Sequence, residues 1–351
     1  MKVLITGGCG FLGSNIAASY LKEGCNVFII DALFRQGGGE NLQWLKNQAD
    51  SGRLVFLKAD LADADAVNGF FQQNGPFDYV CHLGGQVAMT TSLQDPRRDM
   101  LTNVVGTFNI LESVRSYSPE ALVAYSSTNK VYGDLERFDY REASLRYVVD
   151  GYEQGFDESL PLDFASPYGC SKGSADQYVR DWHRNYGLKT VVFRHSSIYG
   201  GRQFSTYDQG WIGWFCQQAI EQAGAQARGV APASFTISGT GKQVRDVLHA
   251  EDLIRLYHSA YTHRNRISGE IFNIGGGAAN SLSLMELFQL LEELLELKPP
   301  LVYERLPRRK SDQNCFVADI KKAETLLEWS PRVSSKEGIT RMLDWVKIAG
   351  R

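Results

Sequence analysis

The chain has 351 residues, of which 43% are hydrophobic and 22% charged, and its formal net charge at pH 7 is −3. This composition allows a large buried core, in one large domain or in a domain with a smaller lobe, and it lacks the basic excess of nucleic-acid-binding proteins. The longest apolar runs fall short of the roughly 20 residues that a membrane-spanning helix needs. We therefore expect neither a nucleic-acid partner nor a membrane span.

The cysteines and the start of the chain indicate a reducing compartment. The six cysteines are scattered without a Cys-x-x-Cys pair, and the residues after Met1 are typical of a strand rather than of a signal peptide. We expect reduced thiols, a cytoplasmic protein and no metal site.

Short apolar runs alternate with stretches of helical periodicity through most of the first 195 residues. This alternation predicts an α/β fold, with a Rossmann-type, doubly wound parallel sheet and right-handed crossovers. The predicted strands are 2–6, 26–30, 54–58, 79–82, 122–125 and 190–193.

A glycine-rich turn follows the first predicted strand. The sequence Gly-Gly-Cys-Gly-Phe-Leu-Gly at 7–13 lets the backbone turn tightly and approach a pyrophosphate at the N-terminus of the next helix. Asp31 ends the second strand, where a carboxylate can bind both ribose hydroxyls and would repel the extra phosphate of NADP. Arg35 nearby keeps NADP open as an alternative. The predicted NAD contacts here are Gly7, Gly10, Phe11, Leu12 and Asp31.

The next two strands end in further candidate contacts. Asp60 and Leu61 follow the third strand, and Leu83 and Gly84 follow the fourth, where adenine and ribose contacts are expected. Each of these residues alone could equally be an ordinary loop residue.

Tyr168 is the only one of sixteen tyrosines that is followed four residues later by a lysine, Lys172. On a helix the two side chains share a face, and we expect the lysine charge to lower the pKa of the phenol from about 10 toward neutrality. Thr128 can hydrogen-bond a reacting oxygen, with Ser126 and Ser127 beside it. The alternative for Thr128 is a hydroxyl that caps the backbone.

The rhythm of strands and helices changes after about residue 195, where Gly-rich loops and a Leu/Glu-rich helical stretch at 283–297 appear. We interpret 1–195 as mainly an NAD-binding domain and 196–351 as mainly a substrate-binding lobe. A segment of about 240–275, with a strand at 271–274, is expected to return to the first domain. The segment 134–164 is longer than a simple link, and it either covers the sugar or builds a subunit contact.

These motifs resemble the extended short-chain dehydrogenase/reductases, the NAD-dependent epimerase/dehydratase family, over nearly the whole chain. Within the family the chain is most similar to the 2-epimerases of CDP-linked sugars. The matching segments are 86–92, 103–107, 125–136, 193–197, 207–211, 245–249, 272–276, 311–313 and 329–331.

The resemblance implies an isomerase that keeps NAD bound and inverts C2 of a CDP-hexose through a 2-keto sugar. Tyr168 is then the acid/base, Lys172 supports it and holds the nicotinamide ribose, and Thr128 binds the reacting oxygen. It also implies a homodimer or homotetramer. Further cofactor contacts would be Gln86, Asn103, Ser126, Ser127 and His195, and His195 would act through its side chain or its backbone. Substrate contacts would be Thr128, Lys130, Ser197, Arg245 and Arg309, with Arg308 as an alternative to Arg309.

Other functions remain as alternatives. A 4,6-dehydratase needs an acid and a base to eliminate water. The dehydratases of the family that this chain resembles carry Asp-Glu directly after the threonine, whereas Asn129-Lys130 stands there in this chain. A reductase that consumes NAD(P)H and a protein that only binds NAD are further alternatives, although the latter would not need an intact catalytic set. The residues do not exclude GDP-, UDP- or dTDP-sugars. The five remaining histidines, interpreted as structural, are His82, His183, His249, His258 and His263.

Overall fold

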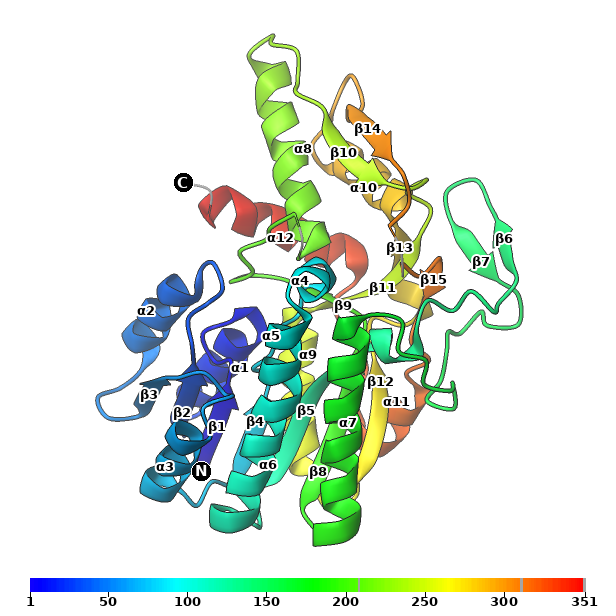
Figure 1. Cartoon of the computed structure of the whole chain (residues 1–351). Helices are drawn as coiled ribbons and strands as arrows, with labels where there is room; N and C mark the ends of the chain where they lie inside the picture. Colours follow the sequence, from blue (N-terminus) through cyan, green and yellow to red (C-terminus); the bar gives the residue numbers. More distant parts are fainter. Residues whose placement is uncertain (208, 310–311, 350–351) are drawn as a thin grey trace.

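Seven parallel strands form the main sheet, in the order β12-β8-β5-β4-β1-β2-β3 (Figure 1). The computed structural model describes residues 1–207, 209–309 and 312–349, so one residue of each of the matched segments 207–211 and 311–313 lies outside the described ranges. The predicted α/β doubly wound fold is confirmed. The strands are β1 (Lys2–Thr6), β2 (Asn26–Asp31), β3 (Leu54–Lys58), β4 (Tyr79–His82), β5 (Leu122–Thr128), β8 (Lys189–His195) and β12 (Glu270–Ile274).

Helices cover both faces of this sheet because its strands are apolar on both sides. In β1, Val3 and Ile5 pack in the core that includes α1, α2, α9 and α11, whereas Leu4 packs in the core that includes α3, α6 and α7. The covering helices are α1 (Phe11–Lys22), α2 (Gly38–Gln48), α3 (Ala64–Asn74), α6 (Gly106–Tyr117), α7 (Pro167–Tyr186), α9 (Ala250–Thr262) and α11 (Lys321–Leu327).

Two strands extend more than one residue beyond the predicted carboxyl ends. The predicted strands 122–125 and 190–193 continue to Thr128 and His195, and these two residues pair with each other. Backbone pairing therefore continues through a polar stretch that a search for apolar runs cannot detect. The result places Ser126, Ser127 and Thr128 at the carboxyl edge of the sheet, where α/β proteins bind ligands.

A smaller lobe lies above this edge in Figure 1. Its own apolar core packs α8, α10 and α12 against short strands. The strand β12 leaves this part of the chain and pairs with β8 in the main sheet; the two-domain division at about residue 195 remains our proposal. The lobe contains β9 (Ser197–Tyr199), α8 (Trp211–Ala227), β10 (Phe235–Ser238), β11 (Val244–His249), η3 (Ala278–Asn280), β13 (Ser281–Ser283), α10 (Leu284–Leu294), β14 (Tyr303–Leu306), β15 (Cys315–Phe316) and α12 (Ser335–Ala349).

The segment 134–164 carries a hairpin, β6 (Tyr140–Glu142) and β7 (Tyr147–Val149), at the side of the molecule (Figure 1). It joins the smaller lobe to the main sheet. Arg146 donates two hydrogen bonds to Glu286 (both 2.6 Å), and the Phe156 N–H donates to the Val317 carbonyl (2.7 Å). The Asn273 amide of β12 donates to the Phe156 carbonyl (2.9 Å).

The connection from β4 to α6 runs through α4 (Met89–Gln94), α5 (Pro96–Met100) and the π-helix η1 (Leu101–Val105), and η2 (Asn129–Tyr132) follows β5. None of the described helices is both long enough and apolar enough to span a bilayer.

Candidate active site

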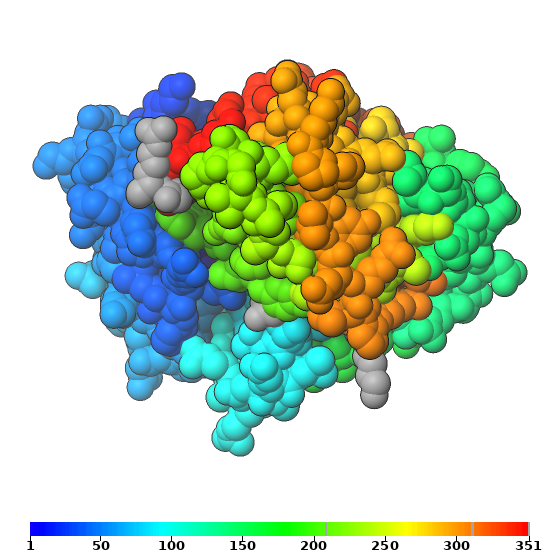
Figure 2. Space-filling view, turned by 90° about the horizontal axis from the view of Figure 1, so that it is seen from above, coloured from blue at the N-terminus to red at the C-terminus, as the bar shows by residue number. Residues whose placement is uncertain are grey.

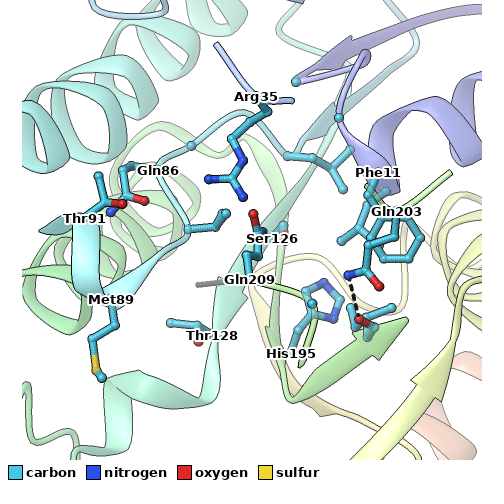
Figure 3. Close-up of a pocket in the computed structure, with 18 of the residues that line it drawn as sticks. Phe11, Arg35, Gln86, Met89, Thr91, Ser126, Thr128, His195, Gln203 and Gln209 are labelled. Atoms are coloured by element: carbon cyan, nitrogen blue, oxygen red, sulfur yellow. Dashed lines mark hydrogen bonds between the residues drawn. The ribbon is translucent and has the colours of Figure 1, made fainter. Parts of the chain in front are cut away.

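The carboxyl ends of the sheet strands open into a cavity of about 740 Å³ that both lobes line. In Figure 2 the cyan segment around α4 lies beside the green and orange segments of the smaller lobe. In Figure 3, Ser126, Thr128 and His195 lie at the strand ends, Gln86 and Thr91 lie across from them, and Arg35 points into the space.

The glycine turn at one end of the cavity fits a dinucleotide phosphate. Gly7 has a φ of +67°, and a Cβ at Gly13 would lie 2.2 Å from the Gly7 carbonyl oxygen, so side chains are excluded at both positions. The turn therefore brings bare backbone to the N-terminus of α1, whose first N–H groups have no partner within the helix. Gly7, Gly10, Phe11 and Leu12 line the cavity.

Asp31 lies beside this turn at the end of β2. Its carboxylate accepts hydrogen bonds from the Cys9 N–H (2.9 Å) and the Leu33 N–H (2.8 Å), which fix its orientation. Burial raises its pKa, although these backbone donors oppose the shift. Asp31 lines the cavity, and a carboxylate can accept about four hydrogen bonds, so it can also bind a ribose diol.

Tyr168 and Lys172 lie on the first turns of α7. The hydroxyl of Ser166 accepts a hydrogen bond from the Gly169 N–H (3.1 Å), and Pro167 occupies the first helical position, so this helix begins at a defined residue. Tyr168 lines the cavity. Lys172 lies behind it, 3% exposed, and its ammonium donates to the Ser126 carbonyl.

The prediction that Lys172 lowers the pKa of Tyr168 toward neutrality is wrong. Burial raises the pKa of Tyr168 to about 12, and only a hydrogen bond with Thr128 opposes this shift. Burial also lowers the pKa of Lys172 to about 7, although Asp176 and Asp99 raise it. Removal from water disfavours both the phenolate of Tyr168 and the ammonium of Lys172, and their spacing on the helix does not overcome this.

Asn103 does not line the cavity, although it was predicted to contact the cofactor. It is 1% exposed in the π-helix η1, and its amide donates to the Ser171 hydroxyl (2.9 Å) and the Gln86 carbonyl (3.1 Å). Its oxygen accepts from the Gln86 N–H (2.8 Å). Asn103 thus joins the segment after β4 to α7, and Asp99, which the sequence did not single out, accepts from both Ser171 and Gln86.

A buried hydrogen-bond chain runs beneath this network through His82. The Thr107 hydroxyl donates to the Asn103 carbonyl (2.6 Å), so its oxygen accepts from Nε2–H of His82 (2.9 Å). The other ring nitrogen, Nδ1, then accepts from the Thr6 hydroxyl (2.6 Å), which itself accepts from the Gly84 N–H (3.0 Å). The chain requires a neutral imidazole, and burial lowers the pKa of His82 to about 3.

Positive charge gathers on the side of the smaller lobe. Asp312 accepts from Nη2 of Arg245 (2.8 Å), and Lys130 Nζ lies 3.7 Å from the same oxygen. Burial opposes ionisation of Asp312, but these cations lower its pKa overall. Arg309 lines the cavity and donates to the Ser238 hydroxyl (3.1 Å), whereas Arg308 is not among the lining residues.

Most of the predicted contact residues line the cavity. The segment 134–164, in contrast, contributes no described lining residue. Of the two alternatives for that segment, a cover over the sugar is therefore not what the structure shows. His195 is 5% exposed, and neither ring nitrogen bonds another described residue. The other predicted residues in the lining are Asp60, Leu61, Leu83, Gly84, Gln86, Ser126, Ser127, Thr128, Lys130 and Ser197.

Sequence reasoning missed Arg202, which connects the two lobes over the glycine turn. Its guanidinium lies between the rings of Trp44 on α2 (4.7 Å to the centroid) and Trp345 on α12 (5.0 Å). Nε donates to the Asn41 side chain (2.8 Å), and Asn41 donates in turn to the Cys9 carbonyl (3.1 Å). The one available signal was the Gly-Gly pair just before Arg202, at the end of β9.

Comparisons with known proteins match nearly the whole chain. The sequence model of the GDP-mannose 4,6 dehydratase family matches residues 4–342. The chain is 52% identical to CDP-paratose 2-epimerase of Salmonella typhi over 345 residues, which are 98% of this chain and 99% of that protein.

Two solved structures have the same architecture. UDP-glucose 4-epimerase of Thermotoga maritima with UDP-glucose is 28% identical, with a TM-score of 0.82 and 100% of both chains covered. UDP-glucuronic acid 4-epimerase of Bacillus cereus, in complex with UDP-glucuronic acid and NAD, is 26% identical, with a TM-score of 0.80 and coverage of 99% and 100%.

We predict that His82 makes the protein less stable in mild acid. The folded-state pKa of about 3 lies below the unfolded value of about 6.5, so the unfolded state binds the extra proton and stability is lost as the pH falls. Between pH 7 and pH 5 this single group should lower the free energy of unfolding by about 2 kcal/mol. Urea unfolding of the wild type and of His82→Gln at both pH values measures the effect. Equal pH dependence in the two proteins would contradict it.

Proposed function

Because the chain belongs to the NAD-dependent epimerase/dehydratase family, the extended short-chain dehydrogenase/reductases, we propose that it epimerises CDP-paratose to CDP-tyvelose at C2. The observation that carries the proposal is the 52% identity to a CDP-paratose 2-epimerase over almost the whole chain. The cavity supports it, because Thr128 and Tyr168 line the same space as the glycine turn, with Lys172 directly behind.

NAD is the proposed cofactor, and the residues present fit it. The glycine turn at 7–13 leaves room for a pyrophosphate, and Asp31 offers its carboxylate to the ribose, where the 2′-phosphate of NADP would be repelled. When bound, NAD supplies the acceptor, and later the donor, of the C2 hydride. His195 and Ser126 line the cavity at the strand ends, where we place the nicotinamide contacts.

The chain's own groups handle the proton and the charge. Tyr168 removes the proton of the C2 hydroxyl as C2 is oxidised and returns it after the keto sugar has presented its other face. Thr128 donates a hydrogen bond to the reacting oxygen. Lys172 in its charged form favours the phenolate of Tyr168, which burial alone disfavours. No net oxidation results, so the cofactor is not consumed.

The positive side of the cavity is the proposed diphosphate site. Arg245 and Arg309 present guanidinium groups that match phosphate oxygens, and Lys130 adds a third cation. The lining favours Arg309 over Arg308 for this role. Asn129 lines the cavity, but its amide, which donates to the Gln313 side chain (3.0 Å), cannot transfer a proton as a carboxylic acid does, and this argues against dehydration.

The reaction predicts a defined isotope pattern. Incubated in heavy water with CDP-paratose and no added NAD, the purified protein should give the C2 epimer without deuterium at C2, because the hydride returns internally. Proton NMR follows the product, with CDP-, GDP- and UDP-hexoses run alongside. Deuterium at C2 would contradict the mechanism, and epimerisation of a GDP- or UDP-sugar instead of CDP-paratose would contradict the substrate.

Tyr168→Phe should lower turnover by about 10²–10⁴-fold, because the proton-transfer group is removed. Bound NAD, measured by its absorbance after denaturation, should remain at the wild-type level. The matched control is Tyr152→Phe, 40% exposed in the segment 134–164, which should turn over normally. A Tyr168→Phe enzyme of near-normal rate would exclude Tyr168 as the acid/base.

We also propose a homodimer that pairs α6 and α7 with their copies, and a homotetramer of such dimers is the alternative. Phe108, Tyr178 and Tyr186 are 41%, 39% and 51% exposed on these helices, and all three rings contact Trp182. A continuous exposed aromatic surface of this kind is typical of a subunit interface.

Tyr178→Glu should therefore convert the assembly to monomers, since it would place a charge at the centre of the aromatic surface. Sedimentation equilibrium should give twice the chain mass of 39.2 kDa for the wild type, or four times for the tetramer, and the single mass for the variant. Ile348→Glu, 66% exposed on α12, serves as the control. A monomeric wild type would refute the proposal.

A further inference from the structure

Tyr125 is buried behind the residues of the site and does not line the cavity. It stands in β5, three residues before Thr128, is 1% exposed and belongs to the core that α7 covers. Lys172 meets it there, with Nζ 4.3 Å from the centre of the Tyr125 ring. This distance is within the range of a cation–π contact.

The pKa of Lys172 lies close to neutral pH, so each neighbouring group affects how much of the side chain is protonated. Burial lowers its pKa to about 7, whereas Asp176 on the same helix and Asp99 on α5 raise it. The histidines that face it, His82 from β4 and His195 from β8, have pKa values that burial lowers to about 3, so they add no charge. The Asp176 carboxylate also bonds Arg194, which offsets its influence on the lysine.

Among the described residues, the Ser126 carbonyl and the Tyr125 ring contact the Lys172 ammonium directly. A carbonyl accepts a hydrogen bond from a neutral amine as well as from an ammonium, so it distinguishes the two forms only in part. The negative face of an aromatic ring attracts the cation. The Tyr125 ring makes the contact with the ammonium and the hydroxyl has Thr107 as its neighbour, so the ring rather than the hydroxyl is the relevant part.

We propose that Tyr125 is a positioning residue that keeps Lys172 protonated by presenting its aromatic face to the ammonium. Its effect on the reaction rests on the proposed function, in which charged Lys172 favours the Tyr168 phenolate. Loss of the ring should lower the pKa of Lys172 by about 1. At pH 7 the protonated fraction of Lys172 would then fall about fivefold.

The test compares the wild type with Tyr125→Phe, which keeps the ring, and Tyr125→Leu, which removes it. In a third variant 3,4,5-trifluorophenylalanine at position 125 keeps the ring shape and weakens its negative face. Each protein carries ¹³C at lysine Cε, and Lys172→Arg identifies the Lys172 resonance. We expect the Lys172 pKa to be unchanged in Tyr125→Phe and lowered in the other two. The high-pH limb of the epimerisation rate should move to lower pH in parallel.

An unchanged Lys172 pKa in folded Tyr125→Leu, or equal values for the phenylalanine and trifluorophenylalanine proteins, would overturn the proposal. If Tyr125→Leu does not fold, the trifluorophenylalanine protein decides, because it keeps the shape of the core. The NMR titration needs no substrate. If no nucleotide sugar is epimerised, the proposed function fails and the titration still judges the role of Tyr125.

Discussion

A buried ion pair ties α7 to the sheet, and the arrangement of the site depends on it. Asp176, one turn after Lys172, accepts hydrogen bonds from Nε (2.8 Å) and Nη2 (3.0 Å) of Arg194 and from the Ser127 hydroxyl (2.9 Å). Asp176 is 0% and Arg194 2% exposed, and charges so far from water are tolerated only with this two-pronged geometry and satisfied lone pairs. The pair holds α7 against β5 and β8, so Tyr168 meets Thr128 at the strand ends.

The two ends of the cavity differ in their electrostatic environment. Around α7 the side chains are desolvated, His82 is neutral, and the charge of Lys172 is sensitive to single contacts. On the side of the smaller lobe, Arg245 and its neighbours are ordered around Asp312 and outnumber it in charge. A strongly anionic diphosphate suits the second environment, and a proton transfer that must run in both directions suits the first.

Much of the frame could be predicted from the sequence because its signals are local. The glycine turn, the alternation of strands and helices and the spacing of Tyr168 and Lys172 each lie within a few residues. The roles of Arg202 and Asp99 could not be predicted from the sequence, because they depend on partners far along the chain, such as Trp345 for Arg202. The pKa of Tyr168 was predicted wrongly because burial, which spacing does not report, raises it.

The segment 134–164 also limits how the reaction can proceed. It is bonded to α10 through Arg146, to the residues after β15 through Phe156 and to the edge strand β12 through Asn273. The same short stretch therefore braces both lobes, and a hinge between them would have to break it. An epimerase must let an oxidised sugar turn over before it is reduced again. In a frame braced in this way, we expect the sugar rather than the protein to make that rotation.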